Sequence, residues 1–271
     1  MAEGVVTPPA VDGGRLTARE YWESRWDRVR LPFVFDPARR DPVAREIAKI
    51  FAAVLPRQAA LDVLEIGGAP GQFLAYLALE YGFRAHALDY SAVGCAKIRE
   101  NFALLGRELE VYERDLFGDL GDLPRFDIVL SMGFIEHFDD FAAAVVRHVG
   151  LLKPGGLLVL GVPNYRGVAA WAMRRLAPRH LALHNLAAMD ERNWTEFARA
   201  FGLDTVFQGY IGGIQPQNWR RCERPTLANQ ALRFSFKLAA QLTRRSAFLR
   251  RYNSRHWSAY LLGVYRKPAS G

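Results

Sequence analysis

The segment VLEIGGAPG, residues 63–71, combines an acidic side chain with closely spaced glycines. Glu65 stands near the end of an apolar run, and Gly67, Gly68 and Gly71 follow it. Glycines let the backbone turn sharply and let a ligand approach where a Cβ would otherwise stand. The pattern is typical of a nucleotide-cofactor loop, although a purely structural turn between a strand and a helix explains it equally well.

The elements around this loop repeat as strand and helix. The apolar run from Leu61 to Ile66 predicts a buried parallel strand, and a helix is expected from Gln72. Residues 84–88 predict a second strand, closed by Asp89 about 20 residues after the glycine loop, where a carboxylate can accept both hydroxyls of a ribose. Further strands are predicted at residues 109–112, 126–130 and 157–162.

The order and spacing of these motifs resemble the class I S-adenosylmethionine-dependent methyltransferases over residues 60–165. The resemblance rests on the glycine loop, the strand ends at Asp89 and Asp115, the fourth strand FDIVLSMGFIEHF and the segment LLKPGGLLVLGVPN. Ala69 stands where the family usually has the middle glycine of GxGxG, and we expect this smallest alternative to be tolerated. An NAD-type enzyme would explain the first two motifs but not the last two.

The resemblance implies that the cofactor is S-adenosylmethionine and indicates which residues hold it. Glu65 and the backbone of residues 67–71 would bind the methionine part, Asp89 the ribose, and Asp115 with Leu116 the edge of the adenine. The full set of expected cofactor-binding residues is Glu65, Gly67, Gly68, Ala69, Gly71, Asp89, Tyr90, Asp115, Leu116 and Ser131.

The same resemblance implies an α/β fold, with a Rossmann-like, seven-stranded, mostly parallel sheet, helices on both faces and the last strand antiparallel. We expect that last strand, residues 258–265, at the sheet edge beside the fifth strand. Residues 59–271 would form the methyltransferase domain. Insertions at about 165–188 and 214–257 follow the carboxyl ends of strands or the edge beside them, where ligands of open α/β sheets bind, so we expect them to act as lids.

Residues 1–58 are expected to form a flexible tail and N-terminal cap helices. The sequence Thr17-Ala-Arg-Glu20 fits a capping box that opens the first helix, and Asp41-Pro42 opens the second. In the family that the chain resembles, such helices often close over the cofactor or the substrate. Simple burial of the aromatic residues on the first helix is the alternative.

Composition narrows the class of protein. A chain of 271 residues, half of them hydrophobic, can bury a substantial core. It contains no apolar run of about 18 residues and begins without a signal-peptide pattern, so we expect a cytoplasmic protein. Cys95 and Cys222 lie far apart without metal-ligand spacing, which argues against a disulfide framework or a zinc cluster, and we expect no metal.

The net charge of +8 arises in one part of the chain. Residues 214–257 contain ten arginines or lysines and a single acidic residue, Glu223, so this segment generates the whole positive excess. Such a localised basic surface suits an anionic partner.

The candidate catalytic residues are His137 and Glu136. Methyl transfer from a sulfonium is an in-line displacement, so alignment of the reactants contributes most of the rate, and a base helps only when the acceptor is a hydroxyl. His137 lies just past the fourth strand, and an unperturbed imidazole titrates near neutrality. Glu136 would orient the imidazole or pair with an arginine. Packing of the pair against the cofactor is the alternative.

We expect a small, anionic acceptor that is methylated on oxygen. The forked guanidinium of arginine fits carboxylate and phosphate groups, so the basic insertion would attract such a molecule. Candidate acceptor-binding residues come from the first helix, the mouth of the fifth strand and the two lids, although packing or capping explains several of them equally well. They are Tyr21, Trp22, Tyr165, His184, Asn185, Arg220 and Arg221.

The basic insertion has two other interpretations. A helix predicted at residues 227–242 carries apolar residues on one face, with arginine pairs at 244–245 and 250–251. Such a helix can lie on an anionic membrane and bring the enzyme to a lipid-like or lipid-linked acceptor, or it can simply be solvated. No nucleic-acid partner is expected, because the DPPY or NPPY signature of amino-methyltransferases is missing after the fourth strand. The sequence leaves the oligomeric state open.

Overall fold

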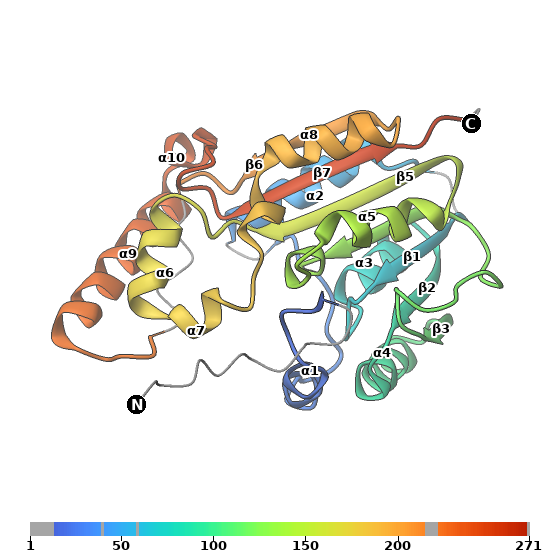
Figure 1. Ribbon diagram of the computed structural model, residues 1–271, viewed down its shortest axis with the longest axis horizontal. Coiled ribbons are helices and arrows are strands. Elements are labelled where there is room, and N and C mark those ends of the chain that lie inside the picture. The colour runs from blue at the N-terminus through green and yellow to red at the C-terminus, as the bar shows by residue number, and fades with distance from the viewer. Residues whose placement is uncertain (1–13, 39–40, 58–59, 215–221, 270–271) are drawn as a thin grey trace, which may run out of the picture.

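A computed structural model describes residues 14–38, 41–57, 60–214 and 222–269 (Figure 1). The tail expected at residues 1–13 lies outside this range. Within the described residues, a seven-stranded sheet has the order β3-β2-β1-β4-β5-β7-β6. Its strands are β1 (Asp62–Ile66), β2 (Arg84–Asp89), β3 (Leu109–Glu113), β4 (Phe126–Met132), β5 (Leu152–Pro163), β6 (Asp204–Ile211) and β7 (Tyr260–Arg266).

The strand directions confirm the predicted fold class. Strands β1 to β5 pair in parallel, and β7 pairs antiparallel with both β5 and β6. The expected edge position of the last strand is wrong, because β7 lies between β5 and β6, and β6 forms the edge. Leu261, Leu262 and Val264 of β7 are completely buried, as a strand inside the sheet requires, whereas the start of β6 at residues 204–206 is exposed.

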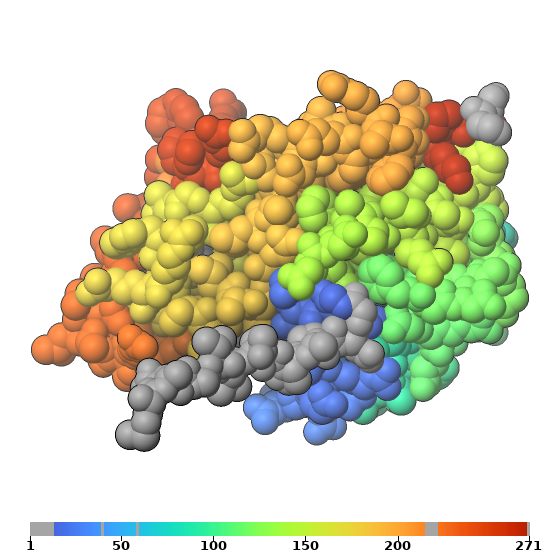
Figure 2. Space-filling view, in the orientation of Figure 1, coloured from blue at the N-terminus to red at the C-terminus, as the bar shows by residue number. Residues whose placement is uncertain are grey.

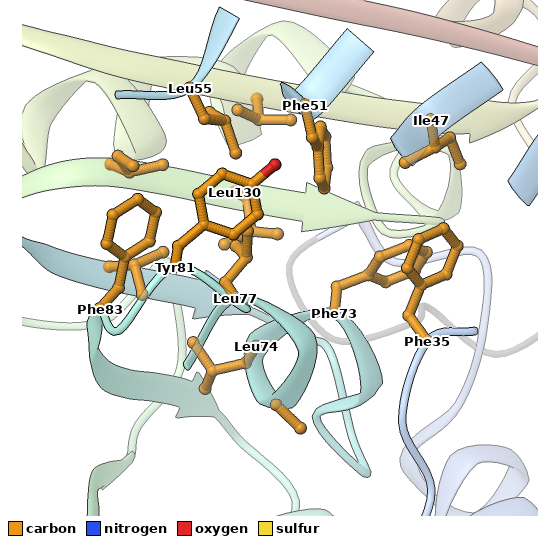
Figure 3. Packing of buried hydrophobic residues seen from close by; sticks show 14 of the residues in the cluster. Phe35, Ile47, Phe51, Leu55, Phe73, Leu74, Leu77, Tyr81, Phe83 and Leu130 are labelled. Carbon is orange, nitrogen blue, oxygen red and sulfur yellow. The ribbon is translucent and has the colours of Figure 1, made fainter. Parts of the chain in front are cut away.

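Helices cover both faces of the sheet. One apolar cluster joins the sheet to α2 (Pro42–Val54), α3 (Gln72–Glu80) and α4 (Ala92–Leu104), and the other joins it to α5 (Phe141–Gly150) and α8 (Glu191–Ala200). Figure 3 shows the first cluster, in which Ile47 and Phe51 of α2 and the following Leu55 pack together with Phe73 and Leu77 of α3.

The two N-terminal helices begin in different ways. At the start of α2, the side chain of Asp41 accepts a hydrogen bond from the Val43 amide at 3.0 Å, and Pro42 occupies the first turn, which confirms the predicted opening. The predicted capping box is wrong. Helix α1 (Arg19–Trp26) starts after Ala18, and no side chain in the described part of the chain caps it. The hydroxyl of Thr17 contacts His137 instead.

The two insertions, which we call the first and second lid after their expected role, pack against each other. The first contains α6 (Val168–Leu176), α7 (Pro178–Leu181) and the short helix η3 (Leu186–Met189), and the second contains α9 (Leu227–Arg245) and α10 (Ala247–Arg251). Ala172 and Leu176 of α6 form a small apolar cluster with Phe236 of α9. In Figures 1 and 2, these insertions, coloured yellow to red, gather at one end of the molecule.

Candidate active site

A cavity of about 660 Å³ opens where the glycine loop, the end of β2, the segment after β4 and the first lid meet. This volume is within the range of small-molecule sites. Most of the residues that the sequence suggested for binding or catalysis line it. They are Tyr21, Trp22, Glu65, Gly67, Gly68, Ala69, Asp89, Tyr90, Leu116, Glu136, His137, Tyr165 and His184.

Two glycines of the loop, Gly67 and Gly68, have no room for side chains. Gly67 has a φ of 63°, and a Cβ on it would overlap the ring of Phe134. A Cβ on Gly68 would overlap the carboxyl group of Glu65. Gly71, with a φ of 82°, is the N-cap residue of α3 and makes the turn into that helix rather than the cavity wall. Gly67 and Gly68 therefore bring bare backbone to the cavity.

Two buried carboxyl groups stand beside this loop. Glu65 accepts a hydrogen bond from the Leu74 amide at 3.1 Å, and Asp89 accepts one from the Ser91 amide at 2.9 Å. Burial raises the pKa of Glu65 to about 8 and that of Asp89 to about 6. A buried carboxylate is stabilised when a cation or additional donors reach it, so the pair fits the ammonium group and the ribose hydroxyls of a nucleoside cofactor.

A third buried carboxyl group, that of Glu136, lies in the short helix η2 (Ile135–His137) after β4. Its side chain is 1% exposed, and its Oε2 has no hydrogen-bond partner among the described residues. Burial raises the pKa of Glu136 to about 8. A buried oxygen without a hydrogen-bond partner lowers the stability of the fold by about 1 to 3 kcal/mol. Such an oxygen is typical of a position where a bound ligand supplies the missing hydrogen bond.

His137 is held in one tautomer. Its Nδ1 lies 2.8 Å from the carbonyl oxygen of Leu183 and 3.1 Å from the hydroxyl of Thr17. Because a carbonyl oxygen only accepts, Nδ1 carries the hydrogen and Nε2 carries the lone pair, 3.8 Å from Oε1 of Glu136. Burial, reinforced by the neighbouring His184, lowers the pKa of His137 to about 3. The ring is therefore neutral.

Aromatic rings surround this histidine. The rings of Trp22 and His184 lie 4.8 and 4.6 Å from that of His137, and the ring of Tyr165 lies 4.9 Å from that of His184. Tyr21 packs edge-on against Trp22 at 5.1 Å. Helix α1 and the first lid thus meet at the candidate base and give it a mainly aromatic wall.

An N-terminal strap, defined as residues 14–17, crosses the site. Its Leu16 amide bonds the carbonyl of His137 at 2.8 Å, and its Gly14 carbonyl accepts from the Asp139 amide at 2.9 Å. The Arg15 guanidinium pairs with Asp115 and lies 4.8 Å from the ring centre of Tyr90. The ring centres of Phe117 and Phe138 lie 5.8 and 5.6 Å from the same guanidinium.

Several expected site residues have other surroundings. Ser131 hydrogen-bonds Nε2 of His148 at 3.0 Å on the far side of β4, because successive strand residues point to opposite faces. Asn185 caps η3 and donates to the carbonyls of Phe138 and Asp139 at 3.0 and 2.8 Å. Neither lines the cavity, nor does Asp115, which pairs with Arg15. Arg220 and Arg221 lie outside the described residues.

Other residues line the cavity without having been predicted. They are Arg15, Thr17, Arg25, Phe134, Met173, His180 and Tyr260, among others. They come from the strap, α1, the segment between β4 and η2, the first lid and β7, so only the tertiary fold brings them together. In the described ranges, no cluster of three or more His, Cys, Asp or Glu side chains is arranged to hold a metal ion. Among those same residues, no helix is long and apolar enough to cross a bilayer.

The fold and the cavity define a cofactor-dependent α/β enzyme, and comparison with known proteins identifies its class. Residues 36–208 match the family model described as a methyltransferase domain. The chain therefore belongs to this family and is an S-adenosylmethionine-dependent methyltransferase. The resemblance inferred from the sequence motifs is confirmed, and so is S-adenosylmethionine as the cofactor.

Named relatives add detail. The chain is 24% identical over 199 residues to a ubiquinone biosynthesis O-methyltransferase of Paramagnetospirillum magneticum, covering 72% of this chain and 78% of that one. It is 26% identical over 242 residues to the protein of the same name from Cereibacter sphaeroides, covering 84% and 96%.

Solved structures share the fold. A putative sarcosine dimethylglycine methyltransferase from Galdieria sulphuraria aligns with a TM-score of 0.58 at 14% identity, over 93% of this chain and 98% of that one. A methyltransferase from Thiobacillus denitrificans, solved with S-adenosyl-L-homocysteine, aligns with a TM-score of 0.53 at 17% identity, over 90% and 95%.

Proposed function

We propose that this methyltransferase acts on a hydroxyl oxygen of a small, flat acceptor, with His137 as the base. The observation that carries the proposal is the hydrogen bond from Nδ1 of His137 to the Leu183 carbonyl. This bond leaves the lone pair on Nε2, beside Glu136 in the cavity wall. A base of this kind is needed for a hydroxyl acceptor and is superfluous for a carboxylate or a thiolate.

The cofactor would lie against the glycine loop. Glu65 and the backbone of Gly67 and Gly68 would hold its methionine part, Asp89 its ribose and Leu116 its adenine. S-adenosylmethionine supplies a methyl carbon bonded to a cationic sulfur, which makes that carbon open to attack by an oxygen. The protein then has to align the oxygen and remove its proton.

His137 and Glu136 would share the proton work. Nε2 of His137 would accept the proton of the acceptor hydroxyl, which converts the imidazole into an imidazolium. An ionised Glu136, with Oε1 3.8 Å from Nε2, would stabilise that imidazolium. The low pKa of His137 is therefore compatible with a base role once Glu136 is ionised, because the opposite charge raises the affinity of the ring for a proton.

Several features support the choice of acceptor. The rings of Tyr21, Trp22 and Tyr165 line the cavity, which suits a flat apolar body. Arg25 of α1 also lines the cavity, and together with the basic insertion it favours an acceptor with a negative charge. The relatives named O-methyltransferases agree with transfer to oxygen.

A second candidate function keeps this chemistry and changes the acceptor to a lipid-linked hydroxyl compound. The observation in its favour is the exposure of large apolar side chains on α9, such as Leu227 and Phe234, at 86% and 67%. Acceptors that carry apolar chains of different lengths, assayed with and without vesicles, would separate the two candidates.

The decisive experiment measures formation of S-adenosylhomocysteine from S-adenosylmethionine, with a panel of hydroxylated aromatic acids as methyl acceptors. His137→Ala should lose about 10²- to 10⁴-fold in kcat, as expected for a general base, with cofactor affinity little changed. His256→Ala, at an exposed histidine outside the cavity, is the matched control. Near-normal kcat in His137→Ala would remove the base assignment and leave alignment as the mechanism.

A further inference from the structure

Helix α9 is amphipathic in an unusual sense, because its apolar face points away from the protein. Leu227, Phe234, Leu238 and Leu242 recur at spacings of seven and four residues, which places them on one side of the helix. They are 86%, 67%, 48% and 52% exposed. The prediction that residues 227–242 form a helix with one apolar face is confirmed, and that face is on the surface.

The opposite side of α9 makes the contact with the protein. Its buried residues are Asn229, Phe236, Ala240 and Thr243. They are displaced by about two positions from the exposed apolar set, which corresponds to about 200° around the helix. Small and polar groups thus dominate the inward side, while leucine and phenylalanine point outward. The exposed leucine and phenylalanine side chains contribute no free energy of burial unless another molecule covers the outer face.

Two further large apolar side chains are exposed, one on α10 and one at the residue that follows it. Phe248 and Tyr252 are 65% and 47% exposed, and their rings pack edge-on at 4.7 Å. We refer to Leu227, Phe234, Leu238, Leu242, Phe248 and Tyr252 together as the outer apolar surface.

Cations accompany this surface. Residues 224–257 contain no aspartate or glutamate. Lys237, Arg245 and Arg251 are exposed on α9 and α10, and Arg233 of α9 is half-buried. A partner for this part of the molecule must therefore offer both apolar material and negative charge.

We propose that the outer apolar surface docks on an anionic lipid bilayer. An amphipathic helix with leucine and phenylalanine on one side and cations beside them inserts its apolar side chains below the headgroups, while the cations bind anionic lipids. A second copy of this chain fits less well, because self-association through α9 would bring two surfaces of the same positive charge together. The bilayer satisfies both requirements with a single partner.

Docking would place the cavity close to the membrane. Phe236 of α9 packs against Ala172 and Leu176 of α6, and Met173 of α6 lines the cavity. Figure 1 shows α9 on the outside of α6 at the lid end of the molecule. Helices α9 and α6 would thus lie between the acceptor cavity and the lipid. Membrane docking does not depend on which acceptor the enzyme methylates. The second candidate function, with a lipid-linked acceptor, depends on membrane docking.

The test is cosedimentation of the full chain with phosphatidylcholine vesicles, with and without phosphatidylglycerol. We expect binding that needs phosphatidylglycerol and weakens in high salt. The double variant Phe234→Ser with Leu238→Ser should lower the partition coefficient about tenfold or more. The triple variant Lys237→Gln, Arg245→Gln and Arg251→Gln should lower it about fivefold for each cation removed.

Matched controls use the same changes elsewhere on the surface. Leu104→Ser alters a leucine of α4 that is 57% exposed, and Arg199→Gln alters an exposed arginine of α8. Both should bind vesicles as the wild type does. Every substituted position is exposed, and the buried Phe236 that attaches α9 to α6 stays unchanged. Circular dichroism should therefore show the same folded state for every variant.

Three results would overturn the proposal. The wild type could fail to bind anionic vesicles, or could bind neutral and anionic vesicles alike. The variants of the outer apolar surface could bind as tightly as the controls. Finally, analytical ultracentrifugation could reveal a dimer that Phe234→Ser with Leu238→Ser abolishes, and a second copy would then be the partner. Vesicle binding requires no methyl acceptor, so its failure would leave the proposed function standing.

Discussion

The hydroxyl of Thr17 lies 3.1 Å from Nδ1 of His137, so the N-terminal strap touches the candidate base directly. The Leu183 carbonyl contacts the same nitrogen from the first lid. Thr17 and Leu183 are 120 and 46 residues away from His137 in the sequence. The orientation of the imidazole therefore depends on two segments, the strap and the first lid, that both contribute residues to the cavity wall.

Thr17→Val should lower kcat by up to about tenfold, because it removes one of the two contacts that orient Nδ1, and such hydrogen bonds contribute about 0.5 to 1.5 kcal/mol. The affinity for S-adenosylhomocysteine, measured by calorimetry, should stay the same. Thr195→Val, on the exposed side of α8, is the control. A parallel loss of cofactor affinity would mean that Thr17 supports the strap as a whole rather than the base.

Asp89→Ala should weaken binding of S-adenosylhomocysteine by about 1 to 3 kcal/mol, because ribose hydroxyls would be left without an acceptor at a buried position. Asp204→Ala, at an exposed position of β6, should bind normally. Calorimetry on both variants provides the comparison, and unchanged affinity in Asp89→Ala would remove this residue from the cofactor site.

Arg15→Ala should weaken cofactor binding and speed its dissociation. The Arg15 guanidinium forms part of the cavity wall over Tyr90 and Asp115, where the sequence motifs place the adenine, so its loss opens the site to water. Stopped-flow release of a fluorescent cofactor analogue measures the dissociation rate. The opposite sign, tighter binding in Arg15→Ala, would show that the arginine blocks the adenine position.

The pH dependence of activity should reflect Glu136. Below its pKa of about 8 the carboxyl group is neutral and cannot stabilise an imidazolium on His137. For a hydroxyl acceptor, kcat/KM should therefore rise with pH and level off above about 8, and Glu136→Gln should remove most of this rise. A pH profile that Glu136→Gln leaves unchanged would separate Glu136 from the proton transfer.

Stability should fall between pH 6.5 and 8. Glu65 and Glu136 have an ordinary pKa of 4.5, which burial raises to about 8 in the fold. The folded state therefore holds their protons more tightly, so their contribution is complete below about pH 4.5 and is lost as the pH rises through about 8. Burial lowers the pKa of His137 from 6.5 to about 3 and that of His148 from 6.5 to about 4. These histidines therefore reduce stability only as the pH falls below 6.5.

Between pH 6.5 and 8, each of the two glutamates lowers the free energy of unfolding by at most about 1.4 kcal/mol per pH unit. Glu136→Gln should roughly halve the slope, because one of the two titrating groups is gone. Urea unfolding at several pH values from 6.5 to 8 measures it. A flat wild-type curve would show that the two carboxyl groups are ionised in the fold at neutral pH.

The parts of the site that depend on local sequence were predictable. Glu65, Gly67 and Gly68 stand in one short loop, and Asp89 ends the next strand, so strand and turn patterns suffice to bring them together. The parallel direction of β1 to β5 follows from the same repeat of strand and helix, whereas the antiparallel direction of β7 was implied only by the family resemblance.

Other parts depend on long-range contacts that local patterns do not reveal. Arg15 and Tyr260 come from opposite ends of the chain, and no local signal marks either of them as part of the cavity. Ser131 faces His148 rather than the cavity, because a shift of one residue along β4 reverses the face. The location of β7 inside the sheet depends on which neighbours cover its apolar residues, which no short segment encodes.

The place of β7 between β5 and β6 also bears on how the protein is made. A ribosome delivers β5 and β6 long before residues 260–266, so the nascent chain has two strand edges with a gap between them that only the later strand fills. Unpaired edges of this kind readily join other chains. Strands β1 to β5 can pair with one another as they emerge, whereas β6 has no partner, and β5 has one unpaired edge, until β7 has been made.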